Sequence, residues 1–202
     1  MKVFHFLYNG IMKQQKQLHH INQKYIWTLI ARGWDFTVYH YEKDQVIKYS
    51  RLSLLLWAAH RNKMIYDYTI CKKYLQDYIV ESTVLSWSSQ YIELQPYIIW
   101  STFETKYLHH KKIAKQLKDI IKCVHQMQQD WYPPIDLIGA PWLLGKYLAN
   151  IIVDKDHNLQ IIDATLLESK SVWWLWYIFQ PIIWLAILIQ QKNLKAIMKT
   201  LS

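Results

Sequence analysis

The chain has 202 residues and a formal net charge of +9, from 24 Lys and Arg against 15 Asp and Glu. This length is ample for one hydrophobic core, and the positive charge favours acidic partners such as nucleotide phosphates, anionic lipid or nucleic acid. The basic residues are dispersed, however, and no RNP-like, zinc-finger or helix-turn-helix pattern is present, so no specific nucleic-acid binding is expected.

The cysteines and the N-terminal segment indicate the cellular compartment. Cys71 and Cys123 have no CxxC or Cys/His spacing, which argues against a zinc site and favours reduced thiols. The apolar start at residues 3–8 lacks the length and the cleavage site of a signal peptide. We therefore expect a cytoplasmic protein.

Residues 29–49 predict three consecutive strands. The first ends near Gly33, the second covers residues 36–41, and the third covers residues 45–49, with a turn between the last two. Lys48 lies on the third strand between apolar and aromatic neighbours. The pattern predicts a β-meander that ends in a lysine.

Three further elements follow in chain order. Residues 62–74 predict a helix that contains Asp67, and residues 79–83 lead into a strand pair whose second strand, residues 91–98, contains Leu94 and Gln95. Residues 103–129 predict a long amphipathic helix. Its apolar face is formed by Ile113, Leu117, Ile120, Ile121, Val124 and Met127.

A hairpin signal spans residues 151–162, where two short aliphatic runs flank a polar cluster at residues 154–158. Asn150 precedes the first run and Asp163 follows the second, so both are expected on the open side of the hairpin. An amide and a carboxylate are oxygen ligands of the kind that Mg²⁺ prefers. The alternative is an ordinary hairpin with polar residues at its ends.

The C-terminal segment, residues 172–189, is apolar apart from Gln180 and is interrupted by Pro181. We expect two shorter buried helices, residues 172–180 and 182–191, because a proline and a glutamine near the middle do not suit a membrane span. Its Trp-rich start leaves interfacial membrane contact as the alternative.

This order of elements resembles the protein-kinase and aminoglycoside-phosphotransferase superfamily. The resemblance implies an α+β, two-lobed fold with an antiparallel N-lobe sheet at about residues 25–95 and a small helical C-lobe at residues 96–202, together forming one unit. It also implies ATP and Mg²⁺ as cofactors. Lys48 would bind phosphates, paired with Asp67; Gly33 would belong to the phosphate loop; the backbone near Leu94 and Gln95 would face adenine; Asn150 and Asp163 would bind the metal.

The sequence departs from the family pattern at the catalytic base. Counting back five residues from Asn150 gives Gly145, where the pattern has an Asp, and a glycine cannot accept a proton. Asp136, in the loop before the hairpin, is the candidate replacement, and a role in a turn is its alternative. The phosphate loop keeps one glycine, and Trp34 and Phe36 are bulky.

The expected function is therefore ATP and Mg²⁺ binding with transfer of the γ-phosphoryl group to an unknown hydroxyl acceptor. Two alternatives stay open. One is a catalytically inactive pseudokinase-like module that recruits a protein partner. The other is a membrane-associated accessory protein that uses the Trp-rich C-terminal segment.

Overall fold

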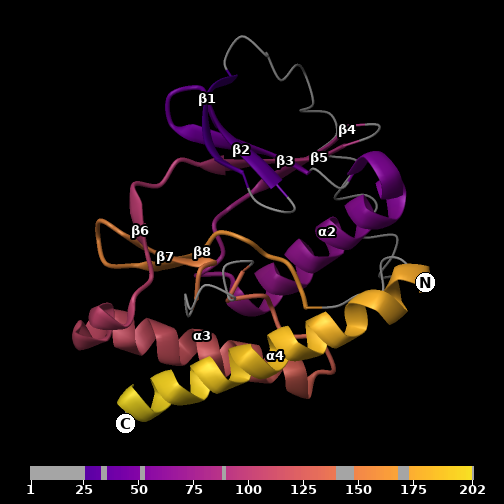
Figure 1. Ribbon diagram of the computed structural model, residues 1–202. Coiled ribbons are helices and arrows are strands. Elements are labelled where there is room, and N and C mark those ends of the chain that lie inside the picture. Colours follow the sequence, from indigo (N-terminus) through magenta and orange to yellow (C-terminus); the bar gives the residue numbers. More distant parts are fainter. Residues whose placement is uncertain are drawn as a thin grey trace. The chain divides into compact units, whose positions relative to one another are not determined.

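The computed structural model describes residues 26–32, 36–50, 53–87, 90–139, 148–167 and 173–201. The fold is α+β, with an antiparallel N-terminal sheet and helices, as predicted (Figure 1). The chain divides into two compact units. The first comprises Met1–Trp57 and Glu81–Tyr97, and the second comprises Ala58–Val80 and Ile98–Ser202.

The first unit contains a five-stranded antiparallel sheet in the order β1-β2-β3-β5-β4. Its strands are β1 (Ile26–Arg32), β2 (Phe36–Tyr41), β3 (Gln45–Ser50), β4 (Thr83–Trp87) and β5 (Gln90–Pro96). The first three strands form the predicted meander. In the β2–β3 turn, Glu42 has a φ of 54°, a left-handed conformation that is common in tight turns.

Alternation of side chains along the strands gives this sheet two different faces. One face is apolar and aromatic, built from Tyr41, Ile47 and Ile92 with Tyr39, Tyr49 and Leu94 against them. The other face carries the buried polar side chains Lys48, Ser50, Glu93 and Gln95. The register places Lys48 opposite Glu93, so a lysine and a glutamate share the polar face.

The second unit contains the larger hydrophobic core. Its elements are most of α2 (Ser53–Leu75), β6 (Trp100–Thr102), the 3₁₀ helix η2 (Thr105–His109), α3 (Lys111–Gln129), β7 (Ile151–Asp154), β8 (Leu159–Ile161) and α4 (Trp173–Leu201). Strands β6, β7 and β8 form an antiparallel sheet in that order. The core joins side chains from α2, α3, the hairpin and α4, including Leu75, Leu117, Ile151, Leu159 and Ile197.

Helix α3 confirms the predicted amphipathic helix. All six residues predicted for its apolar face are buried, because a repeat of three and four residues keeps them on the side that faces the core. The helix starts at Lys111 rather than at Phe103. His110 has extended backbone, with φ −83° and ψ 112°, and it separates α3 from η2.

Helix α2 extends further toward the N-terminus than predicted. From Ala58 onward this helix belongs to the second unit. The reason is packing, since Ile70 and Leu75 lie in the core of that unit. After Tyr97 the chain enters the second unit again.

Helix α4 differs from its prediction. It is one continuous helix with Pro181 inside it, so the expectation of two shorter helices is wrong. A stripe of four α4 residues packs into the core and offsets the cost of an internal proline. These residues are Ala186, Gln190, Leu194 and Ile197.

The expectation that this segment is buried is also only partly right, since Trp184 is 58% exposed and Leu188 is 56% exposed. Over the described ranges, no helix has the length and apolar character needed to cross a membrane.

Candidate functional site

The β7–β8 hairpin places Asn150 and Asp163 at its open end. The N–H of Ile162 donates to the C=O of Asn150 at 3.0 Å, which ties the two ends of the hairpin together directly beside Asp163. Both predicted metal ligands are half-buried. The hydroxyl of Thr165 donates to Oδ1 of Asp163 at 2.5 Å and orients that carboxylate.

The loop after α3 lies against the same end of the hairpin. The N–H of Asp136 donates to the C=O of Thr165 at 2.8 Å, and Nδ2 of Asn150 donates to the C=O of Asp136 at 2.8 Å. Ile135 forms an antiparallel bridge with Leu166. Asp136 is thereby brought beside Asn150 and the segment of Asp163, although the three are far apart in sequence.

The carboxylate of Asp136 is fixed by its own loop. Its Oδ1 accepts the N–H groups of Ile138 at 3.1 Å and Gly139 at 2.9 Å. These hydrogen bonds are those of a turn residue, the alternative role predicted for Asp136. Gly139 has a φ of 61°, and a Cβ there would stand 2.7 Å from Oδ1 of Asn150. Only a glycine therefore fits between this turn and Asn150.

Helix α2 holds the segment that follows β8. Lys63, Asp67 and Cys71 are spaced one turn apart on one face of the helix. The buried Asp67 accepts the N–H of Leu166 at 3.0 Å and forms an ion pair with Lys63. Sγ of Cys71 donates to the C=O of Ala164 at 3.5 Å. Burial, with the nearby charge of Asp67, raises the pKa of the Cys71 thiol well above its usual value, so the thiol stays protonated as a donor.

Gln190 of α4 holds the loop that carries Asp136. Its side chain is 2% exposed. Nε2 donates to the C=O of Ile135 at 2.9 Å, and Oε1 accepts the N–H of Leu137 at 2.8 Å. One side chain thus satisfies backbone groups on both sides of Asp136.

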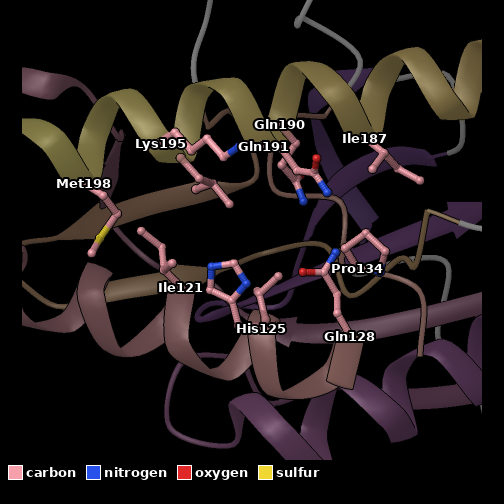
Figure 2. A pocket seen from close by; sticks show the side chains of 11 residues that line it. Ile121, His125, Gln128, Pro134, Ile187, Gln190, Gln191, Lys195 and Met198 are labelled. Carbon is pink, nitrogen blue, oxygen red and sulfur yellow. The ribbon is translucent and has the colours of Figure 1, made fainter. Parts of the chain in front are cut away.

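Beside this contact, α3 and α4 enclose a pocket of about 440 Å³. Figure 2 shows side chains of the two helices facing each other across it, with His125 on α3 and Lys195 on α4 among them. Gln190 also lines the pocket, so the pocket adjoins the residue that holds the Asp136 loop.

Asp154 closes the turn at the other end of the hairpin. Its Oδ1 accepts the N–H groups of Asp156 at 2.8 Å and Asn158 at 2.7 Å, and its Oδ2 accepts Nδ2 of Asn158 at 2.9 Å. Burial acts to raise the pKa of Asp154, but these hydrogen bonds together with the charge of Lys112 outweigh it and the pKa is lowered. The polar cluster of the predicted turn is therefore what closes the hairpin.

Lys48 belongs to the first unit and lies on β3 as predicted, with its side chain 8% exposed. Its Nζ is 5.9 Å from the ring centroid of Phe36. Glu93, opposite Lys48 in the register, accepts a hydrogen bond from Nε2 of Gln95 at 2.7 Å. The pairing of Lys48 with Asp67 would join residues of different units and stays a prediction.

Leu94 and Gln95 lie inside the sheet. The register pairs Leu94 with Ile47 on β3 and with Thr83 on β4, so strands flank its backbone on both sides. The backbone contact with adenine expected near Leu94 and Gln95 stays a prediction. Gly33 and Gly145, the two glycines of the expected nucleotide and catalytic loops, lie outside the described residues.

Sequence reasoning missed Lys63, Thr165 and Gln190. The spacing of Lys63 and Asp67 on a predicted helix was a readable signal for an ion pair. Gln190 ends a long apolar run, and a polar residue buried on a helix face usually has hydrogen-bond partners. Its particular partners are 53 and 55 residues away, and no local pattern indicates them.

No family model and no curated protein matches the chain. Among solved structures, it is similar to the kinase domain of PknI from Mycobacterium tuberculosis, with a TM-score of 0.46 and 10% identity over 68% of this chain. The match spans 57% of that kinase domain. The function proposed below rests on the contacts described above.

Proposed function

We propose that the chain is a kinase-like protein that binds ATP with Mg²⁺ and transfers the γ-phosphoryl group to a hydroxyl acceptor. The observation that supports it is the convergence of Asp136 and Asn150 with the Asp163 segment at the open end of the β7–β8 hairpin. In this proposal Asn150 and Asp163 bind the metal. Asp136 binds the acceptor hydroxyl.

The donor set fits Mg²⁺. Nδ2 of Asn150 is engaged with the C=O of Asp136, so the amide oxygen is the atom that can ligate a cation. Asp163 adds a carboxylate. No three His, Cys, Asp or Glu side chains in the described part of the chain are grouped to hold a metal ion. Mg²⁺ usually takes one or two protein carboxylates and completes its shell with water and substrate phosphates, so an amide and a carboxylate suit it.

Asp136 is proposed as the replacement for the base missing at Gly145. The N–H groups of Ile138 and Gly139 donate to its Oδ1 and fix the direction of the carboxylate. A carboxylate held in this way can accept a hydrogen bond from a hydroxyl and orient it. That is sufficient for phosphoryl transfer, which depends mainly on positioning and charge stabilisation.

The first unit supplies the nucleotide-binding residues of the proposal. Lys48 would bind phosphates, and the backbone near Leu94 and Gln95 would contact adenine. Asp67 has a role that the resemblance did not imply, because its bond to the N–H of Leu166 orders the segment that carries Asp163. When bound, Mg²⁺-ATP supplies the phosphoryl group, and these residues hold and orient it.

A second candidate function is a pseudokinase-like module that recruits a protein partner without using ATP. The specific observation in its favour is the surroundings of Lys48, where Phe36 packs near Nζ on a face shared with Glu93. An aromatic ring at the start of β2 leaves less room for phosphates than a glycine would.

A thermal-shift titration of the full chain with ATP and Mg²⁺ tests the proposal. A ligand that binds only the folded state raises stability by about 2.7 kcal/mol at a hundred times its Kd. We expect a magnesium-dependent rise in Tm for the wild type. We expect this rise to disappear in Asp163→Asn and in Lys48→Ala.

Two further variants separate binding from chemistry. Asp136→Asn keeps an Oδ1 that can accept the N–H groups of Ile138 and Gly139 but removes the carboxylate charge, so we expect it to keep the magnesium-dependent shift and to lose ATP turnover. Asp156→Asn, at the far end of the hairpin, is the matched control and should behave as wild type. A wild-type protein that is folded but shows no shift with Mg²⁺-ATP would overturn the proposal and favour the scaffold role.

A further inference from the structure

Helix α4 presents one exposed apolar line to solvent. Pro181, Trp184, Leu185 and Leu188 are spaced three and four residues apart and are all exposed, and Ile182 beside them is 51% exposed. Single exposed apolar side chains are ordinary, but a contiguous group marks an interaction surface. We therefore expect these residues to form an interaction surface.

The same line continues as a basic stripe. Lys192, Lys195 and Lys199 follow Leu188 at the same spacing and are exposed. Residues 173–201 contain no Asp or Glu. On α3, Nζ of Lys118 donates to the C=O of Leu201 at 2.8 Å, which places further positive charge beside this end of α4.

We propose that this apolar and basic line, residues 181–199 of α4, binds the surface of an anionic lipid bilayer. Tryptophan and aliphatic side chains enter the boundary between headgroups and acyl chains, and lysines bind the phosphates. The arrangement therefore matches both parts of such a surface. The inference is independent of the proposed nucleotide site.

Charge complementarity favours lipid over a second copy of the chain. Two α4 helices packed parallel would bring lysines against lysines, and packed antiparallel they would bring lysines against Trp184 and Leu188. Neither pairing gives the lysines an anionic partner, because residues 173–201 contain no Asp or Glu. A bilayer with anionic headgroups offers apolar chains to Trp184 and Leu188 and phosphates to the lysines.

The contact is shallow. The opposite side of α4 packs into the core, and Gln190 on that side holds Ile135 and Leu137. Full insertion of α4 would break these contacts and expose the core. The helix is therefore expected to lie on the membrane with only its outer line in contact.

Co-sedimentation of the full chain with large vesicles tests the proposal. We expect binding to phosphatidylcholine vesicles that contain phosphatidylglycerol, weak binding to phosphatidylcholine alone, and a loss of binding at high salt. Trp184→Ser should weaken binding to the anionic vesicles by about tenfold, because it removes one large apolar contact. Lys192→Glu should weaken it as well.

Matched controls keep the outcome clear. The control variants are Trp131→Ser and Lys43→Glu, which should bind vesicles as wild type does. Trp131 lies outside α4 and is 96% exposed, and Lys43 is exposed in the β2–β3 turn. Equal losses in Trp184→Ser and Trp131→Ser, or no binding to anionic vesicles, would overturn the proposal. So would a dimer in analytical ultracentrifugation that Leu188→Ser dissociates. The Mg²⁺-ATP shift, measured on the same Trp184→Ser protein, reports separately on the nucleotide site.

Discussion

Asp154 closes the hairpin that carries Asn150 and Asp163 at its other end. We expect Asp154→Ala to lower the free energy of unfolding at neutral pH by about 1 to 2 kcal/mol, because the carboxylate accepts three hydrogen bonds. The loss is modest because solvent screens a carboxylate that is partly exposed. The folded-state pKa is lowered, so this stabilisation is complete above the unfolded pKa and is lost as the pH falls through the folded pKa. Urea unfolding of both proteins at neutral pH and in acid checks it, since the difference should shrink as the pH falls.

Asp156→Ala is the control for this prediction. Asp156 lies in the same turn and is exposed, and it contributes its backbone N–H, which the substitution keeps. We expect wild-type stability at both pH values. A difference for Asp154→Ala that is as large in acid as at neutral pH would show that the ionised carboxylate is not what closes the turn.

At the scale of elements, one side chain of α4 joins this helix to the loop of Asp136. Gln190→Leu removes the hydrogen bonds that the side chain makes to the C=O of Ile135 and the N–H of Leu137. It should lower the free energy of unfolding by about 2 to 4 kcal/mol. Because these groups flank Asp136, ATP turnover should fall more than affinity for Mg²⁺-ATP. Chemical denaturation and steady-state kinetics measure the two effects.

Gln191→Leu is the matched control for Gln190→Leu. Gln191 is the next residue on α4 and lines the same pocket, but it is exposed. Its replacement should leave stability within about 0.5 kcal/mol of wild type, as for most surface changes. Equal stability of the two variants would contradict the role assigned to Gln190.

At the scale of the whole molecule, α4 is both a surface and a part of the core. Deletion of residues 173–201 removes Ala186, Gln190, Leu194 and Ile197 from the core of the second unit, so we expect loss of its cooperative unfolding. Near-ultraviolet circular dichroism and amide hydrogen exchange check this. A truncated chain that keeps a cooperative transition would show that the core does not need α4, and deletion would then isolate membrane binding.

The sequence by itself determined the local elements. The strand-like runs and the turn in residues 36–49 indicated the meander, and the spacing of three to four residues in the predicted helix indicated the buried face of α3. The polar cluster at residues 154–158 identified the hairpin and placed Asn150 and Asp163 at its ends. These features depend on neighbours in the chain, which is why they can be read from it.

Only the tertiary structure decided which distant groups meet. It placed Asp136 beside Asn150, and it brought the N–H of Leu166 within hydrogen-bond distance of the Asp67 carboxylate. It also kept α4 continuous through Pro181. Each of these outcomes depends on packing or on hydrogen bonds between residues far apart in sequence. Their free energies override local preferences, as the internal proline shows, and no periodicity records them.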